Sequence, residues 1–384
     1  MRRRVLLTGG RAPATLELAR SLEAGGCEVV SAESVPFTLT ALSSSVRRAY
    51  SVPPPRQQPE EFAWNLLDIV RREAIDLVLG TCEEVFHIVR GRAILDPHVE
   101  VFAPTLEQMH RLHHKGQFVE WAASLGLPVP HTEVVEERGA LRQRIAADGA
   151  QLVAKPAYSR FASQVRVGEP DPGWVEAVEV SRAVPWVLQE KLEGRRLCSW
   201  SVVRDGRVQA HAVYPMSWSR STGAALRWES VELPEIDVWV ERFAAETGIT
   251  GQLAFDWFVD AERGPLPIEC NPRLTSGVHL FGARAAGLAD AFFGRRQAPL
   301  RPVEGGPSAV VLALVLYGGP ERAELGVIEG WRQIAKCREV LWRLDDPLPY
   351  LLNWLGYVVF VLWGMRYGIS AMAASTHDIE WNGE

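Results

Sequence analysis

The first hundred residues alternate short apolar runs with segments whose apolar positions follow helical spacing. An apolar run at 5–7 leads into a Thr-Gly-Gly turn, residues 14–24 have helical spacing, and 27–31 return to strand character. The pattern then repeats, with a predicted helix at 61–73, a strand at 76–79, a helix from Glu83 and a strand at 99–103. Strands that alternate with helices predict a small parallel sheet covered by helices on its faces.

The turn after the first run carries two adjacent glycines. It reads Gly9-Gly10-Arg11-Ala12-Pro13-Ala14, so the third glycine of the dinucleotide-binding pattern GxGxxG is absent. We therefore interpret it as a tight turn before a helix rather than as a nicotinamide-binding site.

The middle of the chain predicts a second unit of strands and helices. Prolines at 128 and 130 fix an extended entry into a strand that begins at His131. Apolar runs at 186–191, 197–203 and 208–214 predict strands, and Asp205-Gly206 is a typical hairpin turn between the last two. Beyond residue 300 we predict a strand at 309–317 and then a helical region rich in tryptophan.

An apolar segment at 350–365 is the candidate for contact with a membrane. It is shorter than the roughly 20 apolar residues that a spanning helix needs, and Asn353 interrupts it. Leu351, Trp354 and Val358 follow helical spacing. We therefore predict a helix in the core or at the surface of a possible homodimer, with no stable membrane insertion.

Composition narrows the class of protein. The chain has 384 residues, 47% hydrophobic and 23% charged, which is typical of a soluble α/β protein with two or three domains. A formal net charge of -6 argues against nucleic acid as the main partner. The five cysteines lie far apart without a CxxC pair, which indicates reduced thiols and a cytoplasmic protein.

Two strand-like runs carry isolated acidic residues. Asp256 is the one charge within 253–259, and Glu269 lies in 266–270 with Asn271 two positions further on. If the two strands pair as a hairpin, all three side chains can share one face. Carboxylate and amide oxygens without histidine or thiolate suit Mg²⁺. The alternative is that both acids are ordinary strand carboxylates that point to solvent.

The segment from Ile268 to Arg273, Ile-Glu-Cys-Asn-Pro-Arg, resembles the E-x-N-P-R signature of the ATP-grasp enzymes, and Asp256 stands thirteen positions before Glu269, as the first metal-binding acid does in that superfamily. The resemblance covers most of the chain. Overall it implies an α/β protein with a Rossmann-like pre-ATP-grasp domain at 1–112 and an α+β ATP-grasp domain at 113–300. The latter would have a small lobe at about 130–190 and a large lobe at about 191–300, followed by a strand and helical extension at 301–384.

The same resemblance implies the nucleotide-binding residues. Phosphate would be bound by Lys115 and Lys155. The family's glycine-rich flap is replaced here by a stretch without glycine, in which Ser159 and Ser163 could supply hydroxyl donors, or which could be an ordinary loop. The remaining residues implied for the adenine and ribose are Glu190, Lys191, Leu192 and Glu193, where Glu193 would replace the acid that family members have at the position of Arg196.

The metal ligands implied are Asp256, Glu269 and Asn271. Arg273, Ser276 and Gly277 match positions on the acceptor side of the γ-phosphate. Tyr214 and Arg227 belong to a segment, 214–228, that would face the substrate or form a solvated hairpin tip.

The reaction implied is attack of a small-molecule carboxylate on the γ-phosphate of ATP, with Mg²⁺ as cofactor and Mn²⁺ as the alternative ion. An amine would capture the acylphosphate to form an amide, with release of ADP and phosphate. Lys155 and Arg273 would be the catalytic residues. Two alternatives stay open, namely phosphorylation of an enol or another oxygen, and a non-catalytic ATP-binding protein.

Overall fold

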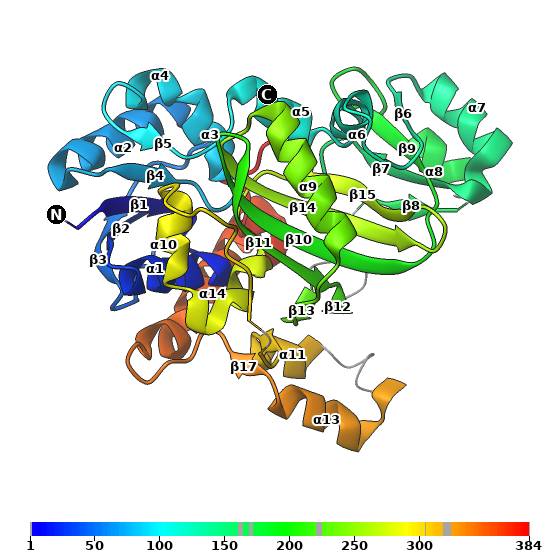
Figure 1. Cartoon of the computed structure of the whole chain (residues 1–384). Helices are drawn as coiled ribbons and strands as arrows, with labels where there is room; N and C mark the ends of the chain where they lie inside the picture. Colours follow the sequence, from blue (N-terminus) through cyan, green and yellow to red (C-terminus); the bar gives the residue numbers. More distant parts are fainter. Residues whose placement is uncertain are drawn as a thin grey trace.

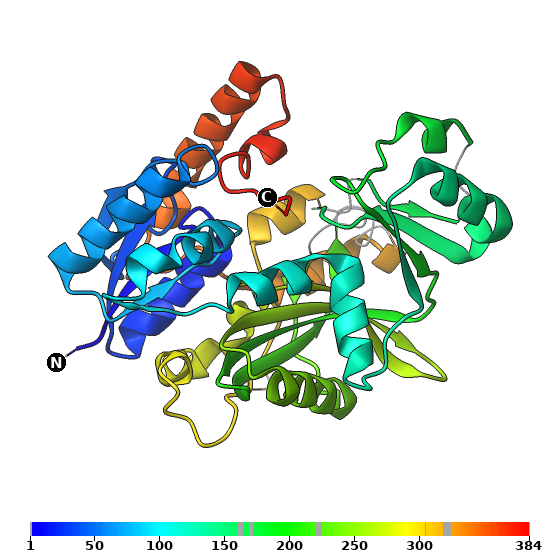
Figure 2. The ribbon, with the colours of Figure 1, turned by 90° about the horizontal axis from the view of Figure 1, so that it is seen from above.

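The computed structural model describes residues 2–159, 164–168, 172–219, 225–303, 305–317 and 324–383. Its mixed α/β class agrees with the prediction. A parallel sheet, a small antiparallel lobe and a large antiparallel sheet follow one another along the chain, and the carboxyl-terminal region returns between them (Figures 1 and 2).

The amino-terminal sheet has five parallel strands in the order β3-β2-β1-β4-β5. Val5 and Leu7 of β1 pack on α1, whereas Leu6 points to the opposite face and packs against α2. The alternation explains why an uninterrupted apolar run serves a sheet covered on both faces. The elements are β1 (Arg4–Thr8), α1 (Pro13–Ala24), β2 (Glu28–Glu33), β3 (Val46–Ser51), α2 (Pro59–Glu73), β4 (Leu77–Leu79), α3 (Glu84–Arg90), α4 (Arg92–Leu95) and β5 (Glu100–Val101).

The small lobe is an antiparallel sheet in the order β6-β9-β7-β8 with its own apolar core. Two helices, α5 (Leu106–His113) and α6 (Lys115–Ser124), connect the amino-terminal sheet to it. Its elements are β6 (Thr132–Val135), α7 (Arg138–Asp148), the 3₁₀ turn η1 (Gly149–Gln151), β7 (Leu152–Pro156), β8 (Arg166–Val167), α8 (Pro172–Ala177) and β9 (Trp186–Glu190).

The large sheet is antiparallel in the order β11-β10-β14-β15. The predicted hairpin is present, since Asp205 and Gly206 have φ of 49° and 72° and join β10 to β11. One face packs on α9 through Phe255 and Trp257, so the alternate residues of β14 point to the other face. The elements are β10 (Arg195–Arg204), β11 (Arg207–Pro215), α9 (Pro234–Thr247), β14 (Gly251–Asp260), β15 (Gly264–Asn271), the 3₁₀ segment η2 (Ser276–Arg284) and α10 (Gly287–Phe292).

The carboxyl-terminal region corrects one predicted strand. Residues 309–317 were predicted to be a strand, but only β16 (Ser308–Ala309) is extended and α11 (Val311–Tyr317) is a helix. A short run of consecutive apolar residues has no period that separates strand from helix. The other elements are β12 (Ser217–Ser219), β13 (Ala225–Trp228), α13 (Val327–Ala335), β17 (Arg338–Glu339), α14 (Leu348–Tyr367) and α15 (Ala371–Ala374).

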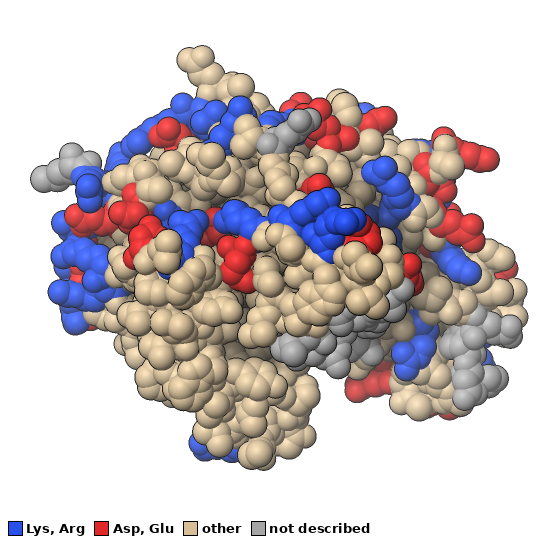
Figure 3. Space-filling model, turned by 90° about the horizontal axis from the view of Figure 1, so that it is seen from below, with Lys and Arg blue, Asp and Glu red and all other residues tan. Residues whose placement is uncertain are grey.

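Helix α14 is not a core helix, which corrects that part of the prediction. Its buried residues are Pro349 and Gly364, whereas Trp354 is 59% exposed. The helix has 20 residues and is long and apolar enough to cross a membrane by length and composition, and 11% of its 18-residue apolar window is buried. The helix projects from the body of the molecule (Figure 2). The part of the surface that protrudes there carries almost no charged residues (Figure 3).

Candidate active site

Four polar side chains form a row across the large sheet. Tyr214 lies opposite Cys198, Cys198 lies opposite Asp256, and Asp256 lies opposite Glu269. Because cross-strand partners share a face, the row lies on the face that α9 leaves uncovered. The hairpin of β14 and β15, also expected from the sequence, therefore brings Asp256 and Glu269 side by side, away from the apolar core under α9.

The two neighbouring carboxyl groups titrate in opposite directions. Removal from bulk water, and after it the negative charge of Glu269, raise the pKa of Asp256 to about 7. For Glu269, burial would also raise the pKa, but the ammonium groups of Lys115 and Lys155 lower it to about 2. Glu269 is therefore the carboxylate that stays ionised at neutral pH. Asp256 is partly protonated at that pH, and a bound cation would favour its ionised form.

Lys155 projects from β7 into this site. Its Nζ donates to Gln189 Oε1 at 3.0 Å and to the Ile268 carbonyl at 3.0 Å. Burial lowers the pKa of Lys155 to about 8, although Glu269 and Asp256 raise it in part. Gln189 was not identified from the sequence. Alternate residues of a strand share a face, so Gln189 lies on the same side of the small sheet as Val187, the strand partner of Lys155. This spacing is the sequence signal by which Gln189 could have been found.

Lys115 enters the site from the first turn of α6. Its Nζ lies 3.7 Å from Glu269 Oε2 and donates to the Ser159 carbonyl at 3.2 Å. Two buried lysines therefore stand beside two carboxylates at the junction of the two lobes. An arrangement of this kind can bind a phosphate chain through the lysines and a divalent cation through the carboxylates.

Asn271 and Arg273 extend the site toward the amino-terminal domain. Asn271 Nδ2 donates to Glu269 Oε1 at 3.4 Å, and an Arg273 amino group donates to Asn271 Oδ1 at 3.2 Å. Arg273 also lies 3.9 Å from the Glu83 carboxylate, which follows β4. Glu83 was not identified from the sequence, because only the tertiary fold brings it here.

The residue set fits a hard cation. Across the described residues, no group of three His, Cys, Asp or Glu side chains is placed to hold a metal ion. The candidate ligands are the two carboxylates of Asp256 and Glu269, which lie opposite one another on β14 and β15, and the amide of Asn271, which contacts Glu269. Such a set suits Mg²⁺, which keeps several of its octahedral positions for water and phosphate oxygens.

The residues expected at the adenine lie at the end of β9. The Glu190 carboxylate accepts hydrogen bonds from the His131 amide at 2.7 Å and from Arg263 at 2.9 Å. The Lys191 amide donates to the Gln151 carbonyl at 2.8 Å. Leu192 is half-buried and Glu193 is exposed. Ser163 lies outside the described residues.

The residues expected at the substrate are divided between two places. A Cβ on Gly277 would lie 2.6 Å from Trp200 Cβ and 3.3 Å from the Tyr214 ring, so Gly277 packs beside Tyr214. Ser276 begins η2 at the same point. Arg227 instead lies on β13, in the sheet shared with the carboxyl-terminal region, and pairs with Glu229 at 2.8 Å.

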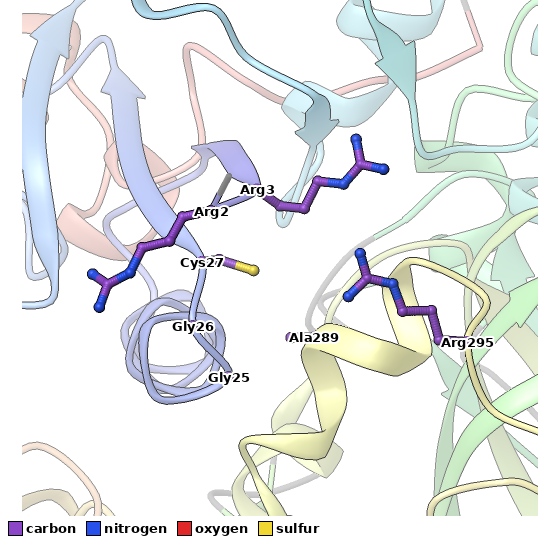
Figure 4. Close-up of a pocket in the computed structure, with 7 residues that line it drawn as sticks. All are labelled: Arg2, Arg3, Gly25, Gly26, Cys27, Ala289 and Arg295. Atoms are coloured by element: carbon purple, nitrogen blue, oxygen red, sulfur yellow. The ribbon is translucent and has the colours of Figure 1, made fainter.

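A surface hollow of about 410 Å³ lies elsewhere, at the amino end of β1 (Figure 4). Its lining includes Arg2, Arg3 and Arg295, of which Arg2 and Arg3 extend in opposite directions. Arg3 pairs with Asp76 at 2.8 Å, and Arg295 lies 3.6 Å from Asp290. These pairs reduce the charge offered to an anion, and we assign the hollow no role.

Comparison with known proteins gives a clear structural result. No protein-family model and no curated protein matches the sequence. Among solved structures, N5-carboxyaminoimidazole synthetase from Staphylococcus aureus in complex with ADP aligns at a TM-score of 0.63 and 13% identity, covering 85% of this chain and 87% of that one.

Two other solved structures are similar to this chain over most of its length. L-amino acid ligase from Bacillus licheniformis aligns at a TM-score of 0.61 and 15% identity, covering 79% of this chain and 78% of that one. The biotin carboxylase domain dimer of Hydrogenobacter thermophilus 2-oxoglutarate carboxylase, in complex with MgADP, ADP and bicarbonate, aligns at 0.62 and 14%, covering 80% and 74%. The chain therefore has the fold of the ATP-grasp ligases.

Proposed function

We propose that this protein is an ATP-dependent ligase that activates a small-molecule carboxylate as an acylphosphate and joins it to an amine. The observation that carries the proposal is the convergence of Lys115, Lys155, Asp256 and Glu269 at the junction of two lobes. Similar folds are found in a ligase of amino acids and in a carboxylase domain bound to MgADP and bicarbonate. The MgADP and ADP bound in these structural neighbours support a nucleotide substrate with Mg²⁺, and we propose ATP as the second substrate with Mg²⁺, or Mn²⁺ in its place, as the cofactor.

The charges suit transfer of a phosphoryl group. Lys115 and Lys155 would bind phosphate oxygens, and their charge would stabilise the transition state in a site withdrawn from water. Asp256, Glu269 and Asn271 would hold the metal ion, which would neutralise further charge on those oxygens. Arg273 and Lys155 would be the catalytic residues, because Arg273 donates to Asn271 and Lys155 donates to the carbonyl next to Glu269, so both lie beside the proposed metal ligands.

The rest of the nucleotide would lie along the end of β9. We place the adenine against the backbone of 190–192 and the ribose near Glu193. The segment that contains Ser159 and Ser163 would cover the phosphates. The proposed substrate-facing residues are Tyr214, Arg273, Ser276 and Gly277 on the acceptor side, together with Arg227 on β13.

The reaction is tested by measuring ADP release over a panel of amino acids and small carboxylates, each with and without an amine. Mass spectrometry of the product separates the outcomes. An amide has lost water relative to its two components. A product that gains a phosphoryl group without amide formation would instead indicate phosphorylation of an enol or another oxygen. Tight ATP binding with no ADP release across the panel would indicate a non-catalytic protein.

The affinity for ATP should fall as the pH rises from 7 to 9. Lys155, whose pKa is about 8, is mostly an ammonium at pH 7 and mostly neutral at pH 9, so we expect about a tenfold loss. Isothermal titration at a fixed Mg²⁺ concentration measures it. Burial raises the pKa of the Cys198 and Cys270 thiols well above this range, so they do not contribute.

Lys155→Met provides the control for this pH dependence. It should bind ATP weakly and should lose the fall in affinity with rising pH, keeping only an opposite trend at the lower end of the range, where Asp256, with a pKa of about 7, ionises. A variant that keeps the full pH dependence would show that another group titrates.

We also propose that the protein works in the cytoplasm, because its five cysteines are free thiols. The exposed apolar face of α14 is the proposed surface of a homodimer. Interfaces are enriched in Trp, Tyr and Met, and Trp354, Tyr357 and Met365 are exposed on this helix. Sedimentation of the wild type and of Trp354→Ser would test whether the helix forms the dimer.

A further inference from the structure

The segment that follows α15 lies along the carboxyl-end edge of the amino-terminal sheet. Arg11, in the turn after β1, donates to both oxygens of Asp378 at 2.7 and 2.8 Å and to the Ser375 carbonyl at 2.8 Å. The same guanidinium pairs with Glu33 at 2.6 Å, at the end of β2. These side chains are 4–7% exposed, so the ion pairs are buried.

This edge is the place where open α/β sheets bind their ligands. Here the chain itself fills it, and Ile379 closes the space beside Thr8, Glu33 and Glu84. Removal of one partner from a buried bidentate Arg–carboxylate pair strongly destabilises the folded protein. The segment is therefore a fixed part of the fold, and its remaining residues are held at the boundary with the two lobes (Figure 2).

Trp381 connects this segment to the acceptor side of the site. Its indole stacks on Phe86 with ring centres 5.7 Å apart. Its amide donates to Glu83 Oε2 at 3.3 Å, and the other Glu83 oxygen lies 3.9 Å from Arg273. A short chain of polar contacts thus leads from the backbone of Trp381 to the arginine beside Asn271.

The segment also reaches the phosphate side. The Trp381 carbonyl lies 3.4 Å from His113 Nε2, two residues before Lys115. Gly383 packs against Tyr158, since a Cβ there would lie 2.7 Å from the ring. Tyr158 precedes Ser159, whose carbonyl accepts the hydrogen bond from Lys115. Two routes therefore lead from one segment to Lys115.

We propose that residues 378–383 act as a positioning segment of the active site, in which Trp381 and Gly383 hold Arg273 and Lys115 in register across the boundary between the amino-terminal domain and the lobes. The inference deepens the proposed ligase function and rests on it for its kinetic consequence. Its residues would act through Glu83, His113 and Tyr158, and Asp378 would anchor them.

The kinetic test compares Trp381→Ala with Phe292→Ala. Phe292 is a fully buried aromatic that packs on Phe102, in a different part of the molecule, so it controls for loss of packing alone. A small displacement of catalytic groups costs about a hundredfold in rate. We expect Trp381→Ala to lower kcat for ADP release by about ten- to a hundredfold, and Phe292→Ala to leave the kcat of its folded fraction near that of the wild type.

A conservative and a minimal variant complete the set. Trp381→Phe keeps both backbone contacts and a stacking ring, so it should recover most of the kcat. Gly383 has a φ of 91°, so Gly383→Ala both strains the backbone there and places a methyl group against the Tyr158 ring, and it should lower kcat. Equal kcat in the wild type, Trp381→Ala and Gly383→Ala would overturn the inference.

Hydrogen exchange of the protein without ligand separates this inference from the proposed function. Trp381→Ala should accelerate amide exchange in peptides that span 112–119 and 271–275, not only in the adjoining α3. Unchanged exchange in both peptides would refute the positioning role even if the enzyme is active. Faster exchange with no ADP release by the wild type on any acid would instead reject the ligase proposal alone.

Discussion

Glu269→Gln is expected to lower ADP release by about two to three orders of magnitude while the fold stays intact. The substitution removes the negative charge that lies 3.7 Å from Lys115 and that lowers the cost of keeping Lys155 charged. It also removes one of two carboxylates proposed as metal ligands. Because Lys155 would lose this support, its pKa should fall below its present value of about 8, so that less of it is an ammonium at neutral pH.

Glu262→Gln is the matched control, since it makes the same chemical change at an exposed position in the turn between β14 and β15. Steady-state ADP release and thermal unfolding should be measured for both variants. Glu262→Gln should behave as the wild type in both assays. If Glu269→Gln retained normal turnover, the proposed metal and phosphate site would be rejected.

The acidic pair was predictable because it depends on local pattern. A single charge in each of two apolar runs, joined by a turn, predicts paired strands whose charged residues share a face. The structure pairs Asp256 with Glu269 in this way. The lysines lacked such a pattern, and Lys115 and Lys155 were identified through resemblance to a known family.

Other features depend on packing between distant segments. Glu83 and Trp381 meet only because the carboxyl-terminal segment returns to the amino-terminal sheet, and no spacing in the sequence encodes that contact. Strand β3 was not predicted, because its sequence Val-Arg-Arg-Ala-Tyr-Ser is polar and lies at an exposed sheet edge. Helix α14 shows the converse, since its apolar composition suggested burial that the fold does not provide.

Arg11→Met is expected to reduce the free energy of unfolding by about 3–5 kcal/mol at pH 8, a large part of the stability of a typical domain. The substitution leaves the buried carboxylates of Glu33 and Asp378 facing one another without their cation. Arg72→Met is the control, because Arg72 makes a 2.6 Å pair with Asp68 at the surface, where both side chains are more than half exposed. Exposed pairs contribute about 0–1 kcal/mol.

The pH dependence distinguishes loss of the ion pair from loss of packing. In the wild type, burial alone would raise the pKa of Asp378, but Arg11 holds it below its ordinary value. The stabilisation by Asp378 is thus present above the unfolded-state pKa of about 3.9 and is lost as the pH falls through the lower folded-state value. Without Arg11, burial should raise that pKa, so the variant should gain stability relative to the wild type as the pH falls. Urea unfolding at several pH values between 8 and 5 should show the difference between the two proteins shrinking. A difference that stays constant over this range would mean that the methionine disrupts packing and that the buried charges are not the cause.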